Sequence, residues 1–510
     1  MFESMISGMW TGISATFIPI NIVMVLFGCF MGSFIGMMPG LGPITAVALM
    51  IPVTYGLDPT TGMVLLAGVY YGAIFGGSTS SILINAPGEA ATVATSLDGY
   101  PLARSGKPGK ALAVAAYSSF SGGTVAVILL MVFAPMLASI SKGFQSVDYF
   151  ALMILGLTAV SAFAGKGGFL KATLMTIVGL MLSTVGTDQT SGTQRFTFGS
   201  IELLDGLEFL MLAMATFALT EALVLVLKRD ASSDSLDPKS IGFKDLKVSK
   251  KEFKLIAPSI ARSSLLGFFV GVLPGAGATL GSFMSYGMER NLAPKKEQEK
   301  FGKGSLRGLA APETGNNAAS SGSFVPLLTL GIPGSGTTAV MLGALVAYGI
   351  DPGPRLFVDR PEVFWGVIMS MYLGNVFLLI LNLPLIPYFA RLLAIPRVIM
   401  IPAILFFSLM GVYLVTFNSF DIQMMVIFCI AALALRLMNF PMAPLLLGFI
   451  LGGLMEDNLR RGLTIYDNSI SFMWERPVTL GINLATLFVL FFPLIRSWLA
   501  TLKNRNRAAA

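Results

Sequence analysis

Long apolar stretches separated by short polar loops make up most of the 510-residue chain. The stretches 124–140, 207–227, 363–381 and 478–494 approach or reach the roughly 20 residues that a helix needs to cross a bilayer. One long polar segment, 228–254, divides the chain near its middle. The pattern predicts an all-α polytopic membrane protein with about 11 to 13 membrane segments in two halves.

Composition narrows the function classes. Charged residues make up 12% of the chain, about half of the share usual in a soluble protein. The net charge is +7, but most Lys and Arg lie in a few loops, as in cytoplasmic connections rather than a nucleic-acid-binding surface. The chain has no histidine, which excludes His-based catalysis and His metal ligands. It also lacks a Gly-x4-Gly-Lys-Ser/Thr phosphate loop, so ATP bound to this chain is not expected as the energy source. No cofactor is expected apart from a coupling ion.

The same glycine–proline motif interrupts an apolar stretch in each half. The copies are Gly32-x3-Gly36-x2-Pro39-Gly40-x-Gly42 and Gly267-x3-Gly271-x2-Pro274-Gly275-x-Gly277. A Pro-Gly-x-Gly segment cannot continue a helix, and backbone groups left unpaired in hydrocarbon are costly, so such breaks occur where protein or water satisfies them. Paired breaks at matching places indicate a transporter's binding site. The first two glycines of each copy repeat at one-turn spacing, which favours helix packing.

The distribution of basic residues predicts that the two halves are inverted repeats. In the first half the loop 55–61 has no basic residue, whereas Arg104, Lys107 and Lys110 follow the second glycine-rich region. In the second half the basic residues concentrate instead in the equivalent of the earlier loop, at 289–307. Equivalent loops would therefore face opposite sides of the membrane.

These patterns give the expected boundaries. The first repeat is expected at 1–227, with a re-entrant helical hairpin at about 18–53, a broken helix at about 60–97 and then spanning helices. A cytoplasmic linker at 228–254 precedes the second, inverted repeat at 255–500, with a hairpin at about 256–288 and a broken helix at about 305–348. A cytoplasmic tail follows at 501–510. The alternative to each hairpin is an ordinary helix pair joined at the membrane surface. The stretch 443–455 is short enough to be re-entrant.

Candidate binding residues are neutral polar groups and glycines at the breaks. The broken-helix regions align at Pro87-Gly88 and Pro333-Gly334. Broken helix ends carry partial charges, so one site can hold a carboxylate on amides and hydroxyls and a sodium ion on carbonyls. The substrate-binding candidates are Pro39, Gly40, Gly42, Ser80, Ser81, Asn85, Pro274, Gly275, Gly277, Asn316, Asn317, Ser335 and Thr337. A sodium site is expected near Gly40, Ser78, Gly275, Ser320 and Gly334. The alternative is that these small residues only pack helices.

Two carboxylates accompany these breaks. Glu89 and Glu313 lie within or next to them, where a buried charge is expensive without a partner. Each could assist a cation or pair with Arg104 or Arg307. Five other charges are interpreted as solvated loop residues: Asp188, Arg195, Asp457, Arg460 and Arg461.

Four motifs carry a family resemblance. They are Gly-Met-Met-Pro-Gly-Leu-Gly-Pro at 36–43, Ser-Ser-Ile-Leu-Ile-Asn-Ala-Pro-Gly at 80–88, Leu-Asp-Gly-Tyr-Pro-Leu-Ala at 97–103 and Gly-Ile-Pro-Gly-Ser-Gly at 331–336. With them, nearly the whole chain resembles the large membrane subunit of the tripartite tricarboxylate transporters, the TctA family. The resemblance implies a bacterial inner-membrane permease that imports carboxylates by elevator-type alternating access, with sodium as the expected coupling ion. It also implies two partners, a small four-helix membrane subunit and a periplasmic substrate-binding protein.

Two other function classes are the alternatives. A membrane-embedded enzyme would need an activated nucleophile or a metal-binding acidic pair at depth, and the absence of histidine and of paired intramembrane aspartates counts against it. A channel differs from a carrier in its response to mutation of Pro39-Gly40 and Pro274-Gly275. A carrier should lose saturable, ion-dependent uptake, whereas a pore should change its conductance. The expected receptor-facing loops are 186–205 and 349–362.

Overall fold

The regular structure of the chain is almost entirely helical. The computed structural model describes residues 2–38, 40–141, 143–162, 168–188, 190–227, 243–275, 277–389 and 397–491. Within these ranges, eight helices are long and apolar enough to cross a membrane, and the two short strands β1 (Gly186–Thr187) and β2 (Gln194–Arg195) pair antiparallel. The prediction of an all-α polytopic membrane protein is confirmed.

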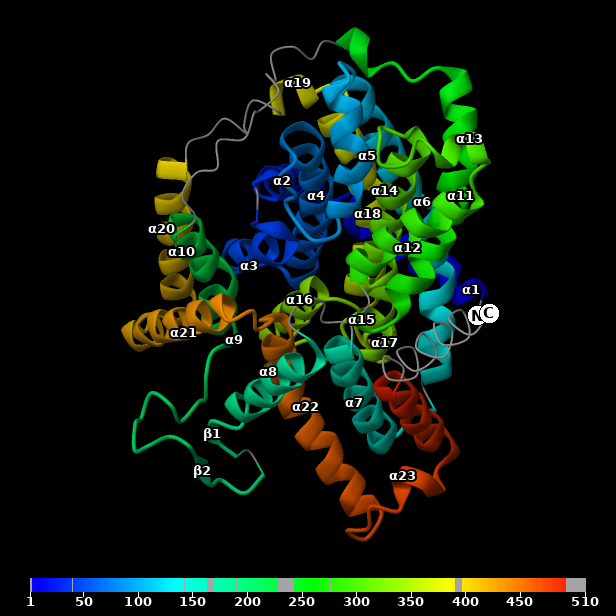
Figure 1. The fold of residues 1–510 in the computed structure, drawn as a ribbon. Coiled ribbons are helices and arrows are strands. Elements are labelled where there is room, and N and C mark those ends of the chain that lie inside the picture. The colour runs from blue at the N-terminus through cyan, green and yellow to red at the C-terminus, as the bar shows by residue number, and fades with distance from the viewer. Residues whose placement is uncertain are drawn as a thin grey trace, which may run out of the picture. The chain divides into compact units, whose positions relative to one another are not determined.

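The helices fall into two compact units (Figure 1). The first unit comprises Met1–Ser139 and Glu208–Ala434. Its helices are α1 (Phe2–Thr16), α2 (Pro19–Met37), α3 (Gly42–Thr54), α4 (Pro59–Ile84), α5 (Val93–Arg104), α6 (Pro108–Ser141), α9 (Phe209–Ala213), a π-helical turn (Met214–Leu219), α10 (Thr220–Leu227), a 3-10 turn (Phe243–Leu246), α11 (Lys250–Val272), α12 (Gly277–Leu292), α13 (Lys295–Gln298), α14 (Leu306–Gly322), α15 (Phe324–Leu330), α16 (Gly336–Ala347), α17 (Leu356–Asp359), α18 (Pro361–Asn382), α19 (Ile386–Phe389), α20 (Arg397–Thr416) and α21 (Ser419–Leu437).

The second unit comprises Ile140–Leu207 and Leu435–Ala510. Its elements are α7 (Ser146–Ala162), α8 (Gly168–Leu182), the two strands, α22 (Ala443–Ile465), α23 (Phe472–Glu475) and the helix Pro477–Phe491. The helix α22 extends beyond the apolar stretch 443–455 to Ile465, and the re-entrant course of that stretch stays a prediction. Glu456 and Arg460 in the charged second half of α22 form ion pairs within this unit.

The interpretation as a solvated charge is wrong for Asp188, whose side chain is 8% exposed, whereas the ion-paired Arg195 and Arg460 are 30% and 36% exposed. The Arg460 guanidinium contacts Asp188 and Glu456 at 2.6 Å each, and Arg195 contacts Glu456 at 2.9 Å. Hydrogen bonds from the Thr190 backbone N–H and from Arg460 hold the pKa of Asp188 below its usual value. The turn that carries β1 and β2 is thereby tied to α22.

Both copies of the glycine–proline motif end one helix and begin another along the same backbone path. α2 and α3 flank the first copy, and α11 and α12 flank the second. The residue after the first helix is extended in both, with φ −75° and ψ 121° at Met38 and φ −74° and ψ 123° at Leu273. Two glycines of each copy then have positive φ. The angles are 89° at Gly40 and 54° at Gly42 in the first copy, and 77° at Gly275 and 57° at Gly277 in the second. This left-handed backbone is why both positions hold glycine.

The glycines before each break are contact points between helices. A Cβ on Gly36 would lie 2.1 Å from the carbonyl oxygen of Ala73 in α4, and one on Gly271 would lie 2.1 Å from that of Ala319 in α14. One turn earlier, the same contact pairs Gly32 with Val69 and Gly267 with Gly315. The packing interpretation of these four glycines is confirmed, since a side chain would force each helix pair apart.

These contacts define which residues of the two halves correspond. Counting on from Ala73 and Ala319, Asn85 corresponds to Gly331, and both end their helices in the left-handed conformation, with φ 52° and 68°. Three residues further on, a Cβ on Gly88 would approach the carbonyl oxygen of Gly36 at 2.2 Å, and one on Gly334 that of Gly271 at 3.0 Å. The correspondence therefore extends from the paired helices into the breaks that follow them.

Candidate functional site

The helices α4 and α14 are buried along their length, although they are rich in polar residues. Every residue from Thr60 to Leu83 in α4 and from Arg307 to Gly322 in α14 is buried. Figure 1 draws the two helices within the first unit, α4 in blue and α14 in yellow-green. Buried polar groups are unfavourable unless they are hydrogen-bonded or serve a function. The two helices are therefore candidates to carry a functional site.

Corresponding residues of the two halves make the same kind of contact: a residue in the break of one half lies beside a residue in the long buried helix of the other. The Tyr70 hydroxyl in α4 lies 3.4 Å from the Ser335 hydroxyl in the break before α16. Tyr70 corresponds to Asn316, and Ser335 corresponds to Glu89 in the break after α4. The Glu89 carboxylate in turn lies beside the Asn316 side chain. Each half thus brings its break to the long buried helix of the other.

Several polar atoms of this cluster are buried without a partner. Both amide atoms of Asn316 and one carboxylate oxygen of Glu89 have no hydrogen-bond partner among the described residues. The Asn317 amide donates to the Glu313 backbone carbonyl at 3.0 Å, but its oxygen also has no partner there. An unsatisfied buried polar atom costs about 1–3 kcal/mol, so these atoms favour a ligand that would pair with them.

Helix amino termini face the same cluster. The helix α3 begins at Gly42, and a Cβ atom added to Gly42 would lie 3.6 Å from the Cβ of Glu89. The helix α12 begins at Gly277, and a Cβ atom added there would lie 3.3 Å from the Cβ of Ser335. Ser335 also caps α16, accepting a hydrogen bond from the Thr338 backbone N–H at 3.2 Å. Amino-terminal N–H groups and the helix dipole favour anions. The first-half position already holds a carboxylate, whereas the second-half position holds a hydroxyl.

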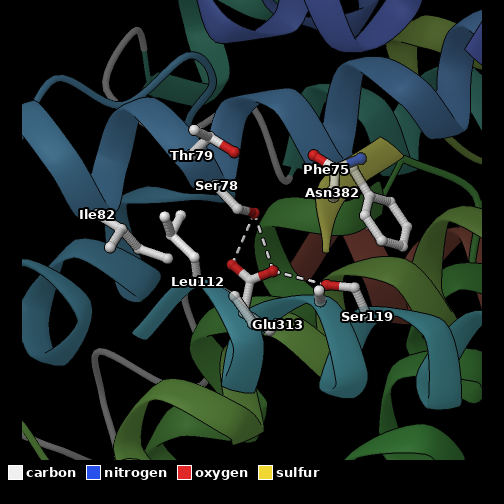
Figure 2. A pocket seen from close by; sticks show the side chains of 10 residues that line it. Phe75, Ser78, Thr79, Ile82, Leu112, Ser119, Glu313 and Asn382 are labelled. Atoms are coloured by element: carbon white, nitrogen blue, oxygen red, sulfur yellow. Dashed lines mark hydrogen bonds between the residues drawn. The ribbon is translucent and has the colours of Figure 1, made fainter. Parts of the chain in front are cut away.

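A second polar group surrounds the Glu313 side chain, which is fully buried. The Ser78 hydroxyl donates to both carboxylate oxygens at 2.8 and 2.9 Å, the Ser119 hydroxyl donates at 2.7 Å, and the Thr95 hydroxyl donates to one oxygen. Figure 2 shows the Glu313 oxygens turned towards Ser78 and Ser119, with Asn382 across the small pocket that they line. Four helices, α4, α5, α6 and α14, therefore meet at one carboxylate.

The predicted arginine partners of the two glutamates are otherwise engaged. Arg307 pairs with Glu289 at 2.9 Å, and the Arg104 guanidinium lies over the Tyr100 ring, 5.9 Å from its centroid. Neither ion pair with Glu89 or Glu313 forms among the described residues, because Arg307 is held at Glu289 beside the bidentate Arg262. Hydroxyl groups take the place of arginine at Glu313.

Some of the substrate-binding candidates lie beside the breaks and the long buried helices, and others do not. The structure places Gly42 beside Glu89, whose carboxylate lies beside Asn316, and it places Gly277 beside Ser335. Asn317 is the next residue along α14. Pro39 lies outside the described residues. Pro274 and Gly275 form the turn before α12, and Thr337 is buried in the first turn of α16. The Ser80 and Ser81 hydroxyls donate to the Gly77 carbonyl within α4, and Asn85 is exposed.

The residues expected near a sodium ion do not form one cluster through the contacts of the described chain. Ser78 donates to Glu313, and the Ser320 hydroxyl donates to the Asn316 carbonyl at 2.8 Å. Gly334 packs against Gly271, whereas a Cβ on Gly40 would approach the Glu221 carboxylate at 2.7 Å. Gly275 contributes a positive φ of 77° to its turn. Of the five, Ser78 is the one whose side chain contacts a carboxylate of a described residue.

Sequence reasoning missed the tyrosine pair. Tyr70 and Tyr71 are buried in the middle of α4; the Tyr71 hydroxyl donates to Ser321 at 3.0 Å, and Tyr70 lies beside Ser320, Ser323 and Ser335. The alignment of Pro87-Gly88 with Pro333-Gly334, counted back to α4, pairs these tyrosines with the two asparagines of α14. That comparison would have identified them.

Comparison with known proteins identifies related chains. The family model described as tripartite tricarboxylate transporter TctA family matches residues 22–447. An Agrobacterium vitis chain described as an uncharacterized 52.8 kDa protein in the TAR-I ttuC' 3' region is 42% identical over 499 residues, which cover 97% of each chain. A second from that organism, described as an uncharacterized protein in the TAR-II ttuC' 3' region, is 42% identical over 234 residues, 45% of this chain and 96% of the relative. No solved structure matches.

Proposed function

The chain belongs to the tripartite tricarboxylate transporter TctA family, and we propose that it is the permease subunit of a binding-protein-dependent carboxylate importer in the bacterial inner membrane. Its partners are a small four-helix membrane subunit and a periplasmic substrate-binding protein. An ion gradient, with sodium as the coupling ion, drives uptake of a di- or tricarboxylate or an aromatic acid. The motif-bearing helices move in an elevator-type cycle. The family is one of transporters, so the role is transport and not catalysis.

The contact that is made twice carries this proposal. In the first half, the Cβ of Glu89 lies next to Gly42 at the amino terminus of α3, and the Glu89 carboxylate lies beside Asn316. In the second half, the neutral Ser335 lies at the amino terminus of α12 and beside Tyr70. A substrate carboxylate bound there would repeat the place of Glu89 and receive hydrogen bonds from Tyr70, Ser335 and backbone N–H groups. The unpartnered Asn316 amide is available to a second polar group of the substrate.

The charge environment supports dipole-based rather than ionic recognition. Among the described residues, no Lys or Arg forms an ion pair with Glu89 or Glu313. A neutral donor set can release an anion during each cycle more readily than a buried cation could. Inverted orientation of the two halves, supported by their opposite basic loops, would let the site open alternately to each side.

Transport of labelled carboxylates tests the proposal. Cells lacking their own carboxylate carriers would express the chain with its small subunit and receptor and receive citrate, C4 dicarboxylates or benzoate. We expect saturable uptake of at least one probe, and Asn316→Ala should reduce uptake about tenfold or more because it removes the available amide. Asn458→Ala is the matched control, since the hydrogen bond found for that amide among the described residues goes to the Leu454 carbonyl within α22.

The rival function, a channel, predicts a different result. Uptake that rises linearly with probe concentration, with a conductance that Asn316→Ala leaves unchanged, would overturn the carrier assignment. Equal loss in Asn316→Ala and Asn458→Ala would remove the evidence for this cluster as the site.

A further inference from the structure

The Glu313 group is separate from the proposed substrate cluster and has a ligand chemistry of its own. Its five side-chain oxygens are the two carboxylate oxygens of Glu313 and the hydroxyls of Ser78, Thr95 and Ser119. They come from α14, α4, α5 and α6. The adjoining pocket, also lined by Thr79 and Asn382, has room for about a single water-sized particle (Figure 2).

Charge balance at this depth calls for a cation. Glu313 is fully buried, and Glu89 is near enough to interact with it electrostatically. The ion pairs of the described residues bring no Lys or Arg to either carboxylate. A buried charge is unfavourable in the membrane interior without a partner, and an arriving substrate carboxylate adds a further negative charge.

The oxygen set selects the kind of cation. Carboxylate and hydroxyl oxygens are ligands for hard cations. A single carboxylate neutralises a monovalent ion, whereas a divalent ion would leave an excess charge in a buried site. Among the described residues, no group of three or more His, Cys, Asp or Glu side chains gathers, so the several acidic ligands common in calcium sites are not found.

We propose that Glu313, Ser78, Thr95 and Ser119 form a sodium-binding site. This inference rests on the proposed function, because it assigns the coupling ion of that transport cycle to particular residues. On binding, the hydroxyls turn from donating to Glu313 to offering their lone pairs to the ion, and the carboxylate becomes its counter-charge.

The site is placed to affect substrate binding. The Asn317 amide donates to the Glu313 backbone carbonyl, and Asn316 adjoins it on the same buried helix. Ser78 lies two turns beyond Tyr70 on α4. Sodium would draw α4 and α14 to a common ligand and fix the helices that present Tyr70 and Asn316. Binding of the ion would thereby prepare the substrate cluster.

Sodium alone is the probe that tests this site. Thermal unfolding of the purified full chain would be followed in NaCl and in choline chloride of equal ionic strength, together with binding of ²²Na⁺. We expect sodium to raise the unfolding temperature of the wild type. Glu313→Gln should abolish both this rise and ²²Na⁺ binding, because it removes the counter-charge while keeping the side-chain shape.

A milder pair of variants keeps the test decisive if Glu313→Gln fails to fold. Ser119→Ala should raise the sodium concentration for half-maximal stabilisation about three- to tenfold, since one ligand is lost. Ser118→Ala is the matched control; its buried hydroxyl has no partner among the described residues and should leave sodium binding unchanged.

Three outcomes would overturn the site. They are an equal sodium response in Ser119→Ala and Ser118→Ala, no sodium response in the wild type, and stabilisation by acidification in place of sodium. The last would make Glu313 a proton acceptor. Because these measurements contain no substrate, their failure alongside Asn316-dependent carboxylate uptake would remove this site and leave the proposed transport function in place.

Discussion

In the first half of the chain α4 carries Tyr70 and Tyr71 where α14 of the second half carries Asn316 and Asn317. The tyrosine rings are 6.0 Å apart between centroids and pack on Phe324 at 5.9 and 6.1 Å. Asparagine fills less space and leaves amide atoms available. One half therefore supplies an aromatic wall with two hydroxyl groups, and the other supplies the amides.

The breaks after α4 and α15 also differ in their side chains, although both begin at a residue in the left-handed conformation, Asn85 and Gly331. Glu89 gives the first half its own carboxylate in the break beside α3, and Ser335 gives the second half none. The positions that both halves keep, Gly36 with Gly271 among them, are contacts between helices. Shared residues thus hold a common framework, whereas residues that differ between corresponding positions carry the chemistry of the proposed site.

The largest expected effect comes from replacing Ser335 in the second break by glutamate, the residue at the corresponding position 89 of the first break. Ser335→Glu would put a carboxylate where we expect the substrate's own carboxylate, and like charges at that distance exclude each other. We expect uptake to fall about 100-fold or more, which corresponds to roughly 2.7 kcal/mol. Initial rates of labelled carboxylate uptake in the assembled transporter would measure it.

Ser335→Ala distinguishes the effect of the added charge in Ser335→Glu from the effect of losing the serine that caps α16. It removes the hydrogen bond from the Thr338 N–H and the contact with Tyr70, so uptake should fall only severalfold, in line with about 1 kcal/mol for a cap. If the alanine and glutamate variants transport equally well, the second break does not receive a carboxylate.

The shared framework predicts equal effects in the two halves. In Gly36→Ala and Gly271→Ala the new methyl group would lie 2.1 Å from a backbone oxygen of the partner helix. Each substitution should lower the free energy of unfolding by about 1–3 kcal/mol, as overpacking does. Thermal unfolding of the purified protein measures this. Gly287→Ala on α12 is the control, because a methyl group there would meet open space; a variant that unfolds like this control would contradict the correspondence in its half.

The framework was predictable because steric rules act on local sequence. Pro-Gly-x-Gly requires a break wherever it occurs, and Gly32 and Gly36 at one-turn spacing imply a close helix contact whichever helix is the partner. The side-chain pairing was not predictable in this way. Glu313 is bound by hydroxyls from three other helices, and no local pattern indicates that Thr95 and Ser119 meet there.

Two of the candidate site residues make local hydrogen bonds that compete with a ligand. Ser80 and Ser81 look like binding residues in the sequence, but a serine in a buried helix readily donates to a carbonyl of the preceding turn, as both do to Gly77. Tyr70 was missed for the opposite reason. A tyrosine within a small-residue helix is typical of packing, and only its correspondence to Asn316 indicates a role at the break.

The tyrosine pair provides the smallest and most selective test of the comparison. Tyr70→Phe removes the hydroxyl that faces Ser335 and should raise the KM for uptake severalfold, in line with about 0.5–1.5 kcal/mol for one hydrogen bond. Tyr71→Phe removes a hydroxyl that donates to Ser321, so it should lower stability by a similar amount and leave KM unchanged. A raised KM in both variants would mean that the substrate contacts the whole aromatic wall; a raised KM in neither would mean that the first half contributes only packing.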